Sequence, residues 1–388
     1  MNARLARPHV PVLRRSLRAA YALLVGTLLA SALHVITRPS TASPKSQSPA
    51  PEMTLPPHAV ARMGKPSVPA KETAARRARP SVLPPNSILF APADQTLITA
   101  KDGLLEYWNA RMGKRERHIS TDDIRQPVMA ISPDGSLLAI GGHAAHHLFL
   151  RLSDGKCVRQ SSRFHDIIAN LSFTPDGQHL VMTGHWGKVM WESVDDRGAK
   201  GKEDTTGEGS LALSADGRRL VSGVLYNTGA GAPFSVWNLG PVGQLNLVGD
   251  PDDRIGKPAD YVQNEHVALS SDGRTLATAS RAPGTVLFWN VKTGSIAKRY
   301  VSHDSDVGPM CFSPDNKTLA LGTTSGNVHV IETFTGKGRG VFAGHLGAVT
   351  CLMFSHDGTR LASGSDDGTS IVWDVTGLDG NKQGSAGH

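Results

Sequence analysis

Three side chains near the end of the chain have the residue types of a hydrolase triad. They are His345, Ser363 and Asp367, which could serve as base, hydroxyl nucleophile and orienting carboxylate. A triad is defined by geometry and by an accessible nucleophile, so residue types alone do not establish one. The sequence contains no phosphate-binding Gly-rich loop, no HExxH motif and no CxxC pair. We therefore predict no catalytic residue and no bound cofactor.

Four histidines are candidates for metal ligands. His143, His146 and His147 lie in the stretch GGHAAHHLF, and His185 occupies a similar place in TGHWGK. A metal site needs three or four converging ligands with supporting second-shell contacts. Nothing in this spacing fixes such convergence, so we interpret the histidines as solvent-facing turn residues and predict no metal site. Stoichiometric zinc or copper in protein purified without a His tag would reverse that interpretation.

The cysteines offer no further chemistry. Cys157, Cys311 and Cys351 have no ligand-type spacing, and an odd number gives no disulfide framework. Free cysteine often behaves as a small apolar side chain, so we expect all three to be buried.

The N-terminus has the pattern of an export signal. Five arginines precede an uncharged apolar run from Ala19 to Ile36, and Ala30-Ser31-Ala32 fits a cleavage site. We predict that residues 1–36 form a signal peptide or an apolar signal-anchor helix, with the rest of the chain outside the cytoplasm. Cleavage would make the protein secreted or periplasmic. Residues 37–75 are rich in Pro, Ser and Ala, and we predict a disordered linker there.

The distribution of charge argues against nucleic acid as a partner. Residues 1–80 hold 13 of the 41 Lys and Arg residues but only two of the 34 acidic residues, Glu52 and Glu72. The remaining 308 residues therefore carry 28 basic and 32 acidic residues. A nucleic-acid-binding domain has an excess of basic residues on its folded part, whereas residues 81–388 carry a net charge of −4.

A repeat of about 42 residues runs through the rest of the chain. The turn SPDG near residue 134 recurs with an aspartate at positions 94, 134, 176, 216, 272, 315 and 357. A second marker keeps the same phase and falls at Trp108, Leu150, Trp191, Trp237, Trp289, Ile331 and Trp373. This period is typical of four-stranded propeller blades.

Each repeat reads as short strands joined by tight turns. In the last one, AVTCLMFS, RLASGS and SIVWDV are separated by Asp357-Gly358 and Asp367-Gly368, which are hairpin signatures. A small sheet with two apolar faces needs covering on both sides, and a closed ring of sheets provides this. We therefore predict an all-β fold, a seven-bladed β-propeller over residues 76–376 with a flexible tail at 377–388.

The ring requires a closing strand. After Val375 the sequence TGLDGNKQGSAGH is too rich in Gly and polar residues to complete the last blade. We predict that Arg76 to Leu83, upstream of the first repeat, pairs into that blade as its outer strand.

The last repeat resembles the WD-repeat β-propeller family. Gly344-His345, Leu361 to Ser365, Asp367-Gly368 and Trp373-Asp374 match that family's GH, LASGS, DG and WD motifs. The resemblance implies a structural hydrogen-bonded tetrad of Asp367, His345, Ser363 and Trp373. It also implies a role in holding protein partners. Repeats two and six lack the tryptophan, and the sixth has Leu321 in place of Ser363, so we expect packing alone to hold them.

Two long insertions mark a candidate partner face. The interval after Asp216 is 56 residues, and its extra residues lie in VLYNTGAGAP and GDPDDRIGKPADYVQNE. Loops on one face of a repeat scaffold commonly bind partners, with exposed aromatic and Arg residues as anchors. We propose as contacts Trp186, Tyr226, Arg254 and Tyr261.

These features predict a monomeric, exported and membrane-tethered scaffold that binds unidentified protein partners, with the membrane contacted through the N-terminal helix. One alternative is a propeller enzyme, a hydrolase or oxidoreductase with a site at the channel mouth. The mostly apolar starts of the first strands count against it. Another is an envelope ligand sensor whose basic tail contacts anionic lipid.

Overall fold

The computed structural model describes most of the chain between Thr54 and Leu378. The described residues are 54–66, 86–121, 123–144, 146–161, 167–184, 188–195, 201–204, 211–214, 219–223, 234–239, 245–247, 266–279, 284–303 and 306–378. The predicted signal segment at residues 1–36 lies outside them.

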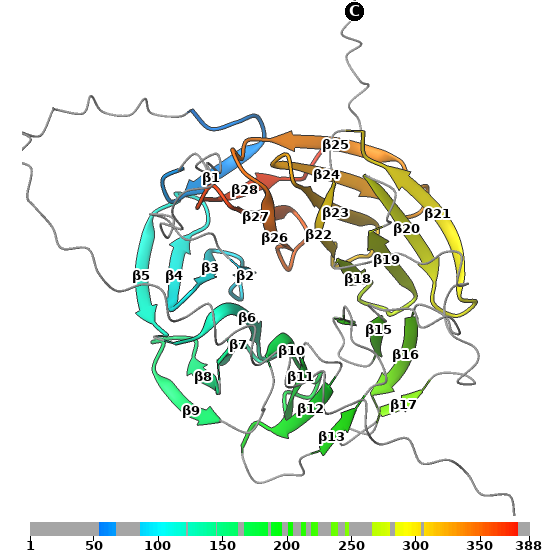
Figure 1. The fold of residues 1–388 in the computed structure, drawn as a ribbon. Helices are drawn as coiled ribbons and strands as arrows, with labels where there is room; N and C mark the ends of the chain where they lie inside the picture. Colours follow the sequence, from blue (N-terminus) through cyan, green and yellow to red (C-terminus); the bar gives the residue numbers. More distant parts are fainter. Residues whose placement is uncertain are drawn as a thin grey trace, which may run out of the picture. The chain divides into compact units, whose positions relative to one another are not determined.

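Seven antiparallel sheets of four strands make up the described part. In blades 1 to 6 strands a to d follow chain order from inside to outside, whereas the outer strand of blade 7 comes from the N-terminal side of blade 1 (Figure 1). Blade 1 contains β2 (Ser87–Phe90), β3 (Thr96–Lys101), β4 (Leu104–Asn109) and β5 (Arg115–Ser120). Blade 2 contains β6 (Arg125–Ile131), β7 (Leu137–His143), β8 (His147–Arg151) and β9 (Cys157–Ser161). Blade 3 contains β10 (Ile168–Phe173), β11 (His179–Gly184), β12 (Lys188–Ser193) and β13 (Gly201–Asp204).

Blades 4 to 7 repeat the arrangement. Blade 4 contains β14 (Leu211–Leu213), β15 (Arg219–Gly223), β16 (Phe234–Leu239) and β17 (Leu245–Leu247). Blade 5 contains β18 (Val267–Leu269), β19 (Thr275–Ala279), β20 (Thr285–Asn290) and β21 (Ser295–Val301). Blade 6 contains β22 (Val307–Phe312), β23 (Thr318–Thr323), β24 (Asn327–Glu332) and β25 (Gly338–Ala343). Blade 7 contains β26 (Val349–Phe354), β27 (Arg360–Ser365), β28 (Ser370–Asp374) and β1 (Ala59–Met63).

The seven blades form a closed ring. Each inner strand contacts the inner strands of the two neighbouring blades, and β26 of blade 7 contacts β2 of blade 1 (Figure 1). The apolar clusters accordingly lie between blades, as where Phe342 of blade 6 packs with Ile371 and Trp373 of blade 7. The prediction of seven four-stranded sheets that cover one another is confirmed.

The closing strand is β1, and the prediction that Arg76–Leu83 closes the ring is wrong. Ala59 to Met63 pairs antiparallel with β28, so this strand lies inside the segment predicted as a disordered linker. In Figure 1 the blue β1 lies beside the red β28. Ala61 and Met63 are buried in the core between blades 7 and 1, while Val60 and Arg62 are partly exposed. The alternation is that of a half-buried strand, but the proline-rich surroundings hid it. Residues 76–83 lie outside the described residues.

The described turns between strands a and b in blades 2, 3, 5, 6 and 7 share one hydrogen-bonding pattern, and blade 1 departs from it. In the regular turns a Ser or Thr hydroxyl donates to the aspartate two residues later, as from Ser132 to Asp134. The next residue, Gly135, has φ +70°. In blade 1 Asp94 itself takes the glycine position with φ 55°, and its N–H donates to Ala91 as that of Gly135 does to Ser132. Asp94 is therefore one position later than the repeat count placed it.

The tryptophan marker is also displaced in blade 3. Leu361 pairs with Trp373 in blade 7, and the equivalent Leu180 pairs with Glu192, not with Trp191. Because side chains alternate between faces along a strand, this one-residue difference turns Trp191 toward blade 4. Trp191 packs there with Val189 and Leu220, while the carboxylate of Glu192 lies on the face toward blade 2.

Candidate functional site

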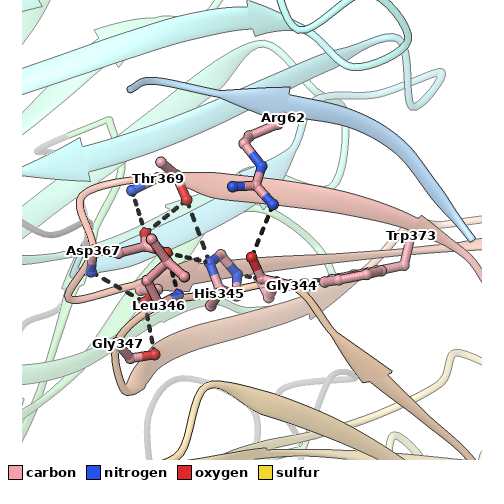
Figure 2. Close-up of polar contacts among 10 residues, drawn as sticks. Arg62, Gly344, His345, Leu346, Gly347, Asp367, Thr369 and Trp373 are labelled. Carbon is pink, nitrogen blue, oxygen red and sulfur yellow. Dashed lines mark hydrogen bonds and ion pairs between the residues drawn. The ribbon is translucent and has the colours of Figure 1, made fainter. Parts of the chain in front are cut away.

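The four residues of the predicted tetrad meet inside blade 7. His345 precedes β26, Ser363 lies in β27, Trp373 in β28, and Asp367 in the turn between β27 and β28. His345 Nδ1 lies 3.2 Å from Asp367 Oδ2, and His345 Nε2 lies 2.7 Å from Ser363 Oγ. The indole Nε1–H of Trp373 donates to the same Ser363 Oγ at 2.8 Å. Figure 2 shows His345 between Asp367 and the Trp373 ring.

Further contacts hold the carboxylate and the loop that carries the histidine. Asp367 accepts hydrogen bonds from the Leu346 N–H at 2.8 Å and from the Thr369 hydroxyl at 2.7 Å. Burial alone would raise the pKa of Asp367, but the hydrogen bond and charge of His345, with the bonds from Thr369 and Leu346, outweigh it. The pKa of Asp367 therefore lies well below its ordinary value, and the group is ionised at neutral pH.

The closing strand supports this loop directly. Arg62 of β1 donates from Nη2 to the Gly344 carbonyl at 2.8 Å, as Figure 2 shows. A side chain at Gly344 would meet Pro56 Cγ at 2.6 Å and Trp373 Cη2 at 2.9 Å, so only glycine fits before His345. Phe342 of β25 stacks on the Trp373 ring at 5.1 Å and 11°. The tetrad thus joins blades 6 and 7 to the N-terminal segment.

The order of contacts is that of a hydrolase triad, but the site is sealed. Asp367, His345 and Ser363 are linked as carboxylate, imidazole and hydroxyl. The side chains of Asp367 and His345 are 0% exposed, as is Ser363, and the serine oxygen already accepts from Trp373. A substrate carbonyl has no approach to this oxygen, whereas nucleophilic catalysis requires one. The arrangement satisfies buried polar groups and holds the blade rigid.

In four other blades, the hydrogen-bonded pair formed by Ser363 and Trp373 in blade 7 is either present in both members or replaced in both by apolar residues. Trp108 Nε1 donates to Thr99 at 3.0 Å in blade 1, and Trp289 Nε1 donates to Thr278 at 2.9 Å in blade 5. At the two corresponding positions, blade 2 has Ile140 and Leu150, and blade 6 has Leu321 and Ile331. The sequence analysis missed the Thr partners because it assigned the tetrad residues only in the last repeat.

Blade 3 replaces the tryptophan with a buried ionic cluster. Glu192 Oε1 lies 2.6 Å from His147 Nε2 and 2.5 Å from Arg159 Nη2, and Ser161 donates to Oε2 at 3.0 Å. Burial opposes ionisation of Glu192, but these partners from blade 2 lower its pKa. His147 is fully buried, so its assignment as a solvent-facing residue is wrong.

Two of the other candidate metal ligands, His143 and His146, do not join His147. His143 is exposed, and His146 Nε2 lies 3.4 Å from Asp123 Oδ1. His185 lies outside the described residues. Among residues that the structure describes, no group of three or more His, Cys, Asp or Glu side chains is arranged to hold a metal ion.

The cysteines divide between core and surface. Burial raises the pKa of Cys351 and of Cys311 to about 12, so both remain thiols at neutral pH. Cys351 is buried, Cys311 is partly buried and Cys157 is exposed on strand d of blade 2, so the expectation that all three are buried holds only for Cys351. Strand d is the outer edge of a blade, which the spacing of cysteines does not reveal.

Trp186, Tyr226, Arg254 and Tyr261 all lie outside the described residues. Within the described ranges, no helix has the length and apolar character to cross a membrane.

Comparisons with known proteins agree with the fold. The family model for the WD domain, G-beta repeat, matches residues 336–374. WD repeat-containing protein 18 of Danio rerio is 29% identical over 54% of this chain and 50% of its own length. A target of rapamycin complex subunit, wat1 of Schizosaccharomyces pombe, is 40% identical over 26% of this chain and 32% of its own length. A guanine nucleotide-binding protein subunit beta from Solanum tuberosum is 26% identical over 74% of this chain and 68% of its own length. The matched region thus covers half or less of the length of the first two of these relatives.

Proposed function

We propose, on the premise that this chain is a WD-repeat protein, that it is a non-catalytic scaffold presenting a propeller face to protein partners. The observation that carries this proposal is the use of His345, Ser363 and Asp367 as a sealed structural network. The three residues whose types fit a hydrolase triad are instead hydrogen-bonded to one another in the interior of blade 7 and stabilise that blade. What remains is a rigid ring with long connections, and such connections commonly carry binding function.

The connections of blade 4 are the proposed contact face. Residues 224–233 join β15 to β16, and residues 248–265 join β17 to β18. The first is a connection between strands b and c, and the second runs from strand d to the next strand a, so both leave the same edge of their sheets. Tyr226, Arg254 and Tyr261 belong to these connections, and Trp186 to the corresponding connection of blade 3. The two relatives whose names describe complex subunits favour a scaffold role.

Capture of partners tests this face. The full-length protein is crosslinked in its native membrane and the co-purifying proteins are identified. We expect Trp186→Ala with Tyr261→Ala to remove at least one specific partner, because truncating anchor residues commonly weakens binding by about 2 kcal/mol or more each. Met112→Ala is the matched control, since Met112 is 70% exposed on a connection between strands c and d, at the opposite sheet edge. An unchanged partner set in the double variant would refute the assigned face.

Export and membrane attachment complete the proposal. The apolar run at residues 19–36 supports them, with the basic segment before it retained in the cytoplasm. In intact cells, protease added from outside the cytoplasm should degrade the propeller, and detergent but not high salt should release the full chain from membranes. Protection from external protease would overturn this localisation while leaving the scaffold role open to the crosslinking test.

A further inference from the structure

A cation from one blade bridges to the next at the interface between blades 1 and 2. Arg117 of β5 stacks its guanidinium over Tyr107 at 3.9 Å from the ring centroid. Its Nη2 donates to the Leu152 carbonyl at 2.6 Å and its Nη1 to the Ser153 carbonyl at 2.8 Å. Both acceptors lie in the turn between strands c and d of blade 2. Arg117 is thus a latch between neighbouring blades.

The same latch recurs at two other interfaces. Arg159 stacks over Phe149 at 4.2 Å and donates to the Ser193 carbonyl of blade 3 at 3.0 Å. Lys298 lies opposite Phe288 in the strand pairing and donates to the Thr333 carbonyl of blade 6 at 3.0 Å. Its ammonium group lies over the Phe334 ring of blade 6, at 5.0 Å from the centroid, rather than over a ring of its own blade. In each of the three blades, the cation on strand d pairs directly with an aromatic residue on strand c. The latch is therefore a positional feature of the repeat.

The interface between blades 6 and 7 lacks both parts of the latch. The paired positions hold Val330 and Gly340, although the strand bulge that precedes them is the same as in blades 1, 2 and 5. The acceptor turn is still present, because the Val375 N–H bonds to the Thr359 carbonyl as Leu152 does to Ser136. A cavity of about 500 Å³ lies at this place, lined by Val330, Phe354, Val375 and Leu378. We call it the 6–7 cavity.

The cavity between blades 1 and 2 confirms that the positions correspond. It measures about 300 Å³ and is lined by Tyr107, Arg117, Leu152 and Ser153. Tyr107 and Arg117 take the places that Val330 and Gly340 have in blade 6. The 6–7 cavity is therefore the latch site without its aromatic ring and its cation, with Leu378 added as an apolar wall.

Two carboxylates and one guanidinium line the 6–7 cavity, which favours a cation, and His356, which also lines it, is paired with Asp94 at 2.7 Å. Asp315 and Asp357 line it, and hydrogen bonds from neighbouring Ser hydroxyls and backbone N–H groups lower the pKa of both despite partial burial. Arg339 also lines it, but its charge is balanced by Glu332, at 2.8 Å. Lys317 lies 3.7 Å from Asp315 and is 75% exposed, so water screens its charge.

We propose that the 6–7 cavity binds the side chain of an arginine presented by a partner polypeptide. The alkyl stem packs between Val330 and Leu378, and the guanidinium donates to the carbonyl of Val375, as Arg117 donates to Leu152. The partner thus supplies in trans the latch that blades 1, 2 and 5 supply in cis. This inference deepens the proposed scaffold role, but it concerns the edge opposite the blade 4 connections and its test requires no cellular partner.

A short peptide tests the site on the full-length protein. The probe is acetyl-Gly-Ala-Arg-Ala-Gly-amide, and the control peptide carries citrulline, which has the same shape without the charge. Binding is measured by ligand-observed NMR at low ionic strength. We expect the arginine peptide to bind at least about tenfold more tightly, since charge-assisted hydrogen bonds are about twice as strong as neutral ones. Equal binding of the two peptides would overturn the proposal.

A variant that fills the cavity provides the second arm. Gly340→Arg places the latch cation in cis, and its Cβ would meet only the flexible end of Leu378, at 3.3 Å. Gly340→Arg should abolish peptide binding and raise the melting temperature, which also shows that the variant folds. Val158→Arg, at the exposed bulge position of blade 2, adds the same charge elsewhere and should leave binding unchanged.

Two further results would count against the proposal. Undiminished binding by folded Gly340→Arg would place the peptide elsewhere. Tighter binding after Lys382→Ala alone would show that the chain's own C-terminal segment occupies the cavity, which refutes a partner as its natural ligand. Loss of crosslinked partners without any change in peptide binding bears on the proposed function only.

Discussion

Blades 6 and 7 are neighbours with the same four-stranded repeat, yet different contacts stabilise the interior of each blade. In blade 7 Ser363 and Trp373 form a buried hydrogen bond that extends through His345 to Asp367. In blade 6 the positions of the serine and the tryptophan hold Leu321 and Ile331, both 0% exposed. At these two positions the same strand pairing therefore accommodates a hydrogen-bonded pair in one blade and two apolar side chains in the next.

The histidines show what decides between the two arrangements. His345 lies four residues before β26, and His303 lies four residues before β22. His345 is buried among its partners, whereas His303 is exposed. A histidine four residues before the inner strand is buried in blade 7, where a hydroxyl and a carboxylate are present as hydrogen-bond partners. Burial without such partners would cost about 1–3 kcal/mol for each unpaired polar group.

The comparison extends to blade 3, where polarity takes a third form. There Glu192 fills the tryptophan position and draws its partners from the neighbouring blade. At the serine and tryptophan positions of blades 1, 2, 5, 6 and 7, a donor and its acceptor are present together or absent together. Blade 3 departs from this, because Trp191 Nε1 is buried there without a hydrogen-bond partner.

The largest expected difference between blades 6 and 7 concerns their outer strands, because blade 7 borrows β1 while blade 6 has its own β25. A chain that begins at Ser67 should melt at least about 10 °C below one that begins at Thr54, since it loses the burial of Ala61 and Met63. Thermal unfolding followed by circular dichroism measures this. The shorter chain retains residues 76–83, so equal melting temperatures would restore those residues as the closing segment.

The next effect concerns the polar interior of blade 7. Ser363→Ala removes the acceptor of Trp373 Nε1 and the partner of His345 Nε2, and should lower the free energy of unfolding by about 3 kcal/mol. Thr99→Ala in blade 1 is the matched control, because it orphans only the Trp108 indole and should cost about half as much. Urea denaturation measures both. Equal losses of unfolding free energy in the two variants would show that the hydrogen bond from Ser363 to His345 adds no stability. The polar interiors of blades 7 and 1 would then be energetically equivalent.

The smallest effect should be shared by both blades. Asp357 of blade 7 and Asp315 of blade 6 occupy equivalent positions in the turn between strands a and b of their blades. Hydrogen bonding lowers the pKa of both carboxyl groups despite some burial, that of Asp357 to about 2. Because the folded-state pKa is depressed, its stabilisation is full above the ordinary pKa and is lost as the pH falls toward 2. Asp357→Asn and Asp315→Asn should each cost under about 1 kcal/mol at pH 7, since both groups are largely exposed. The difference between each variant and the parent should shrink as the pH falls toward 2, because the carboxylates become protonated.

Melting curves between pH 7 and pH 2 measure this pair. A loss confined to Asp357→Asn would mean that the turns of the two blades are not equivalent, which their hydrogen bonds indicate they are. A loss that persists unchanged at pH 2 would show that the carboxylate charge is not its source.

Much of blade 7 could be predicted from the sequence. The positions of His345, Ser363, Asp367 and Trp373 follow from one family pattern, and the structure joins all four. The Trp–Thr bonds of blades 1 and 5 were also within reach, because Thr99 and Thr278 stand two residues after the leucine that pairs with each tryptophan. The closing strand was not, since AVARM has few strand-forming residues and sits among prolines.

The amino-acid sequence by itself determined the number of blades, their turns and the residue types of the tetrad, because a repeat period and hairpin signals are local features. Tertiary structure alone decided that Glu192 rather than Trp191 faces blade 2, and that Asp94 of blade 1 reaches His356 and Asp357 of blade 7. It also decided that β1 closes the ring through contacts such as Arg62 to Gly344, 282 residues apart. The reason is physical: a shift of one residue turns a side chain to the opposite face of its sheet. Which segments meet around a closed ring depends on packing between residues that the order of the chain keeps far apart.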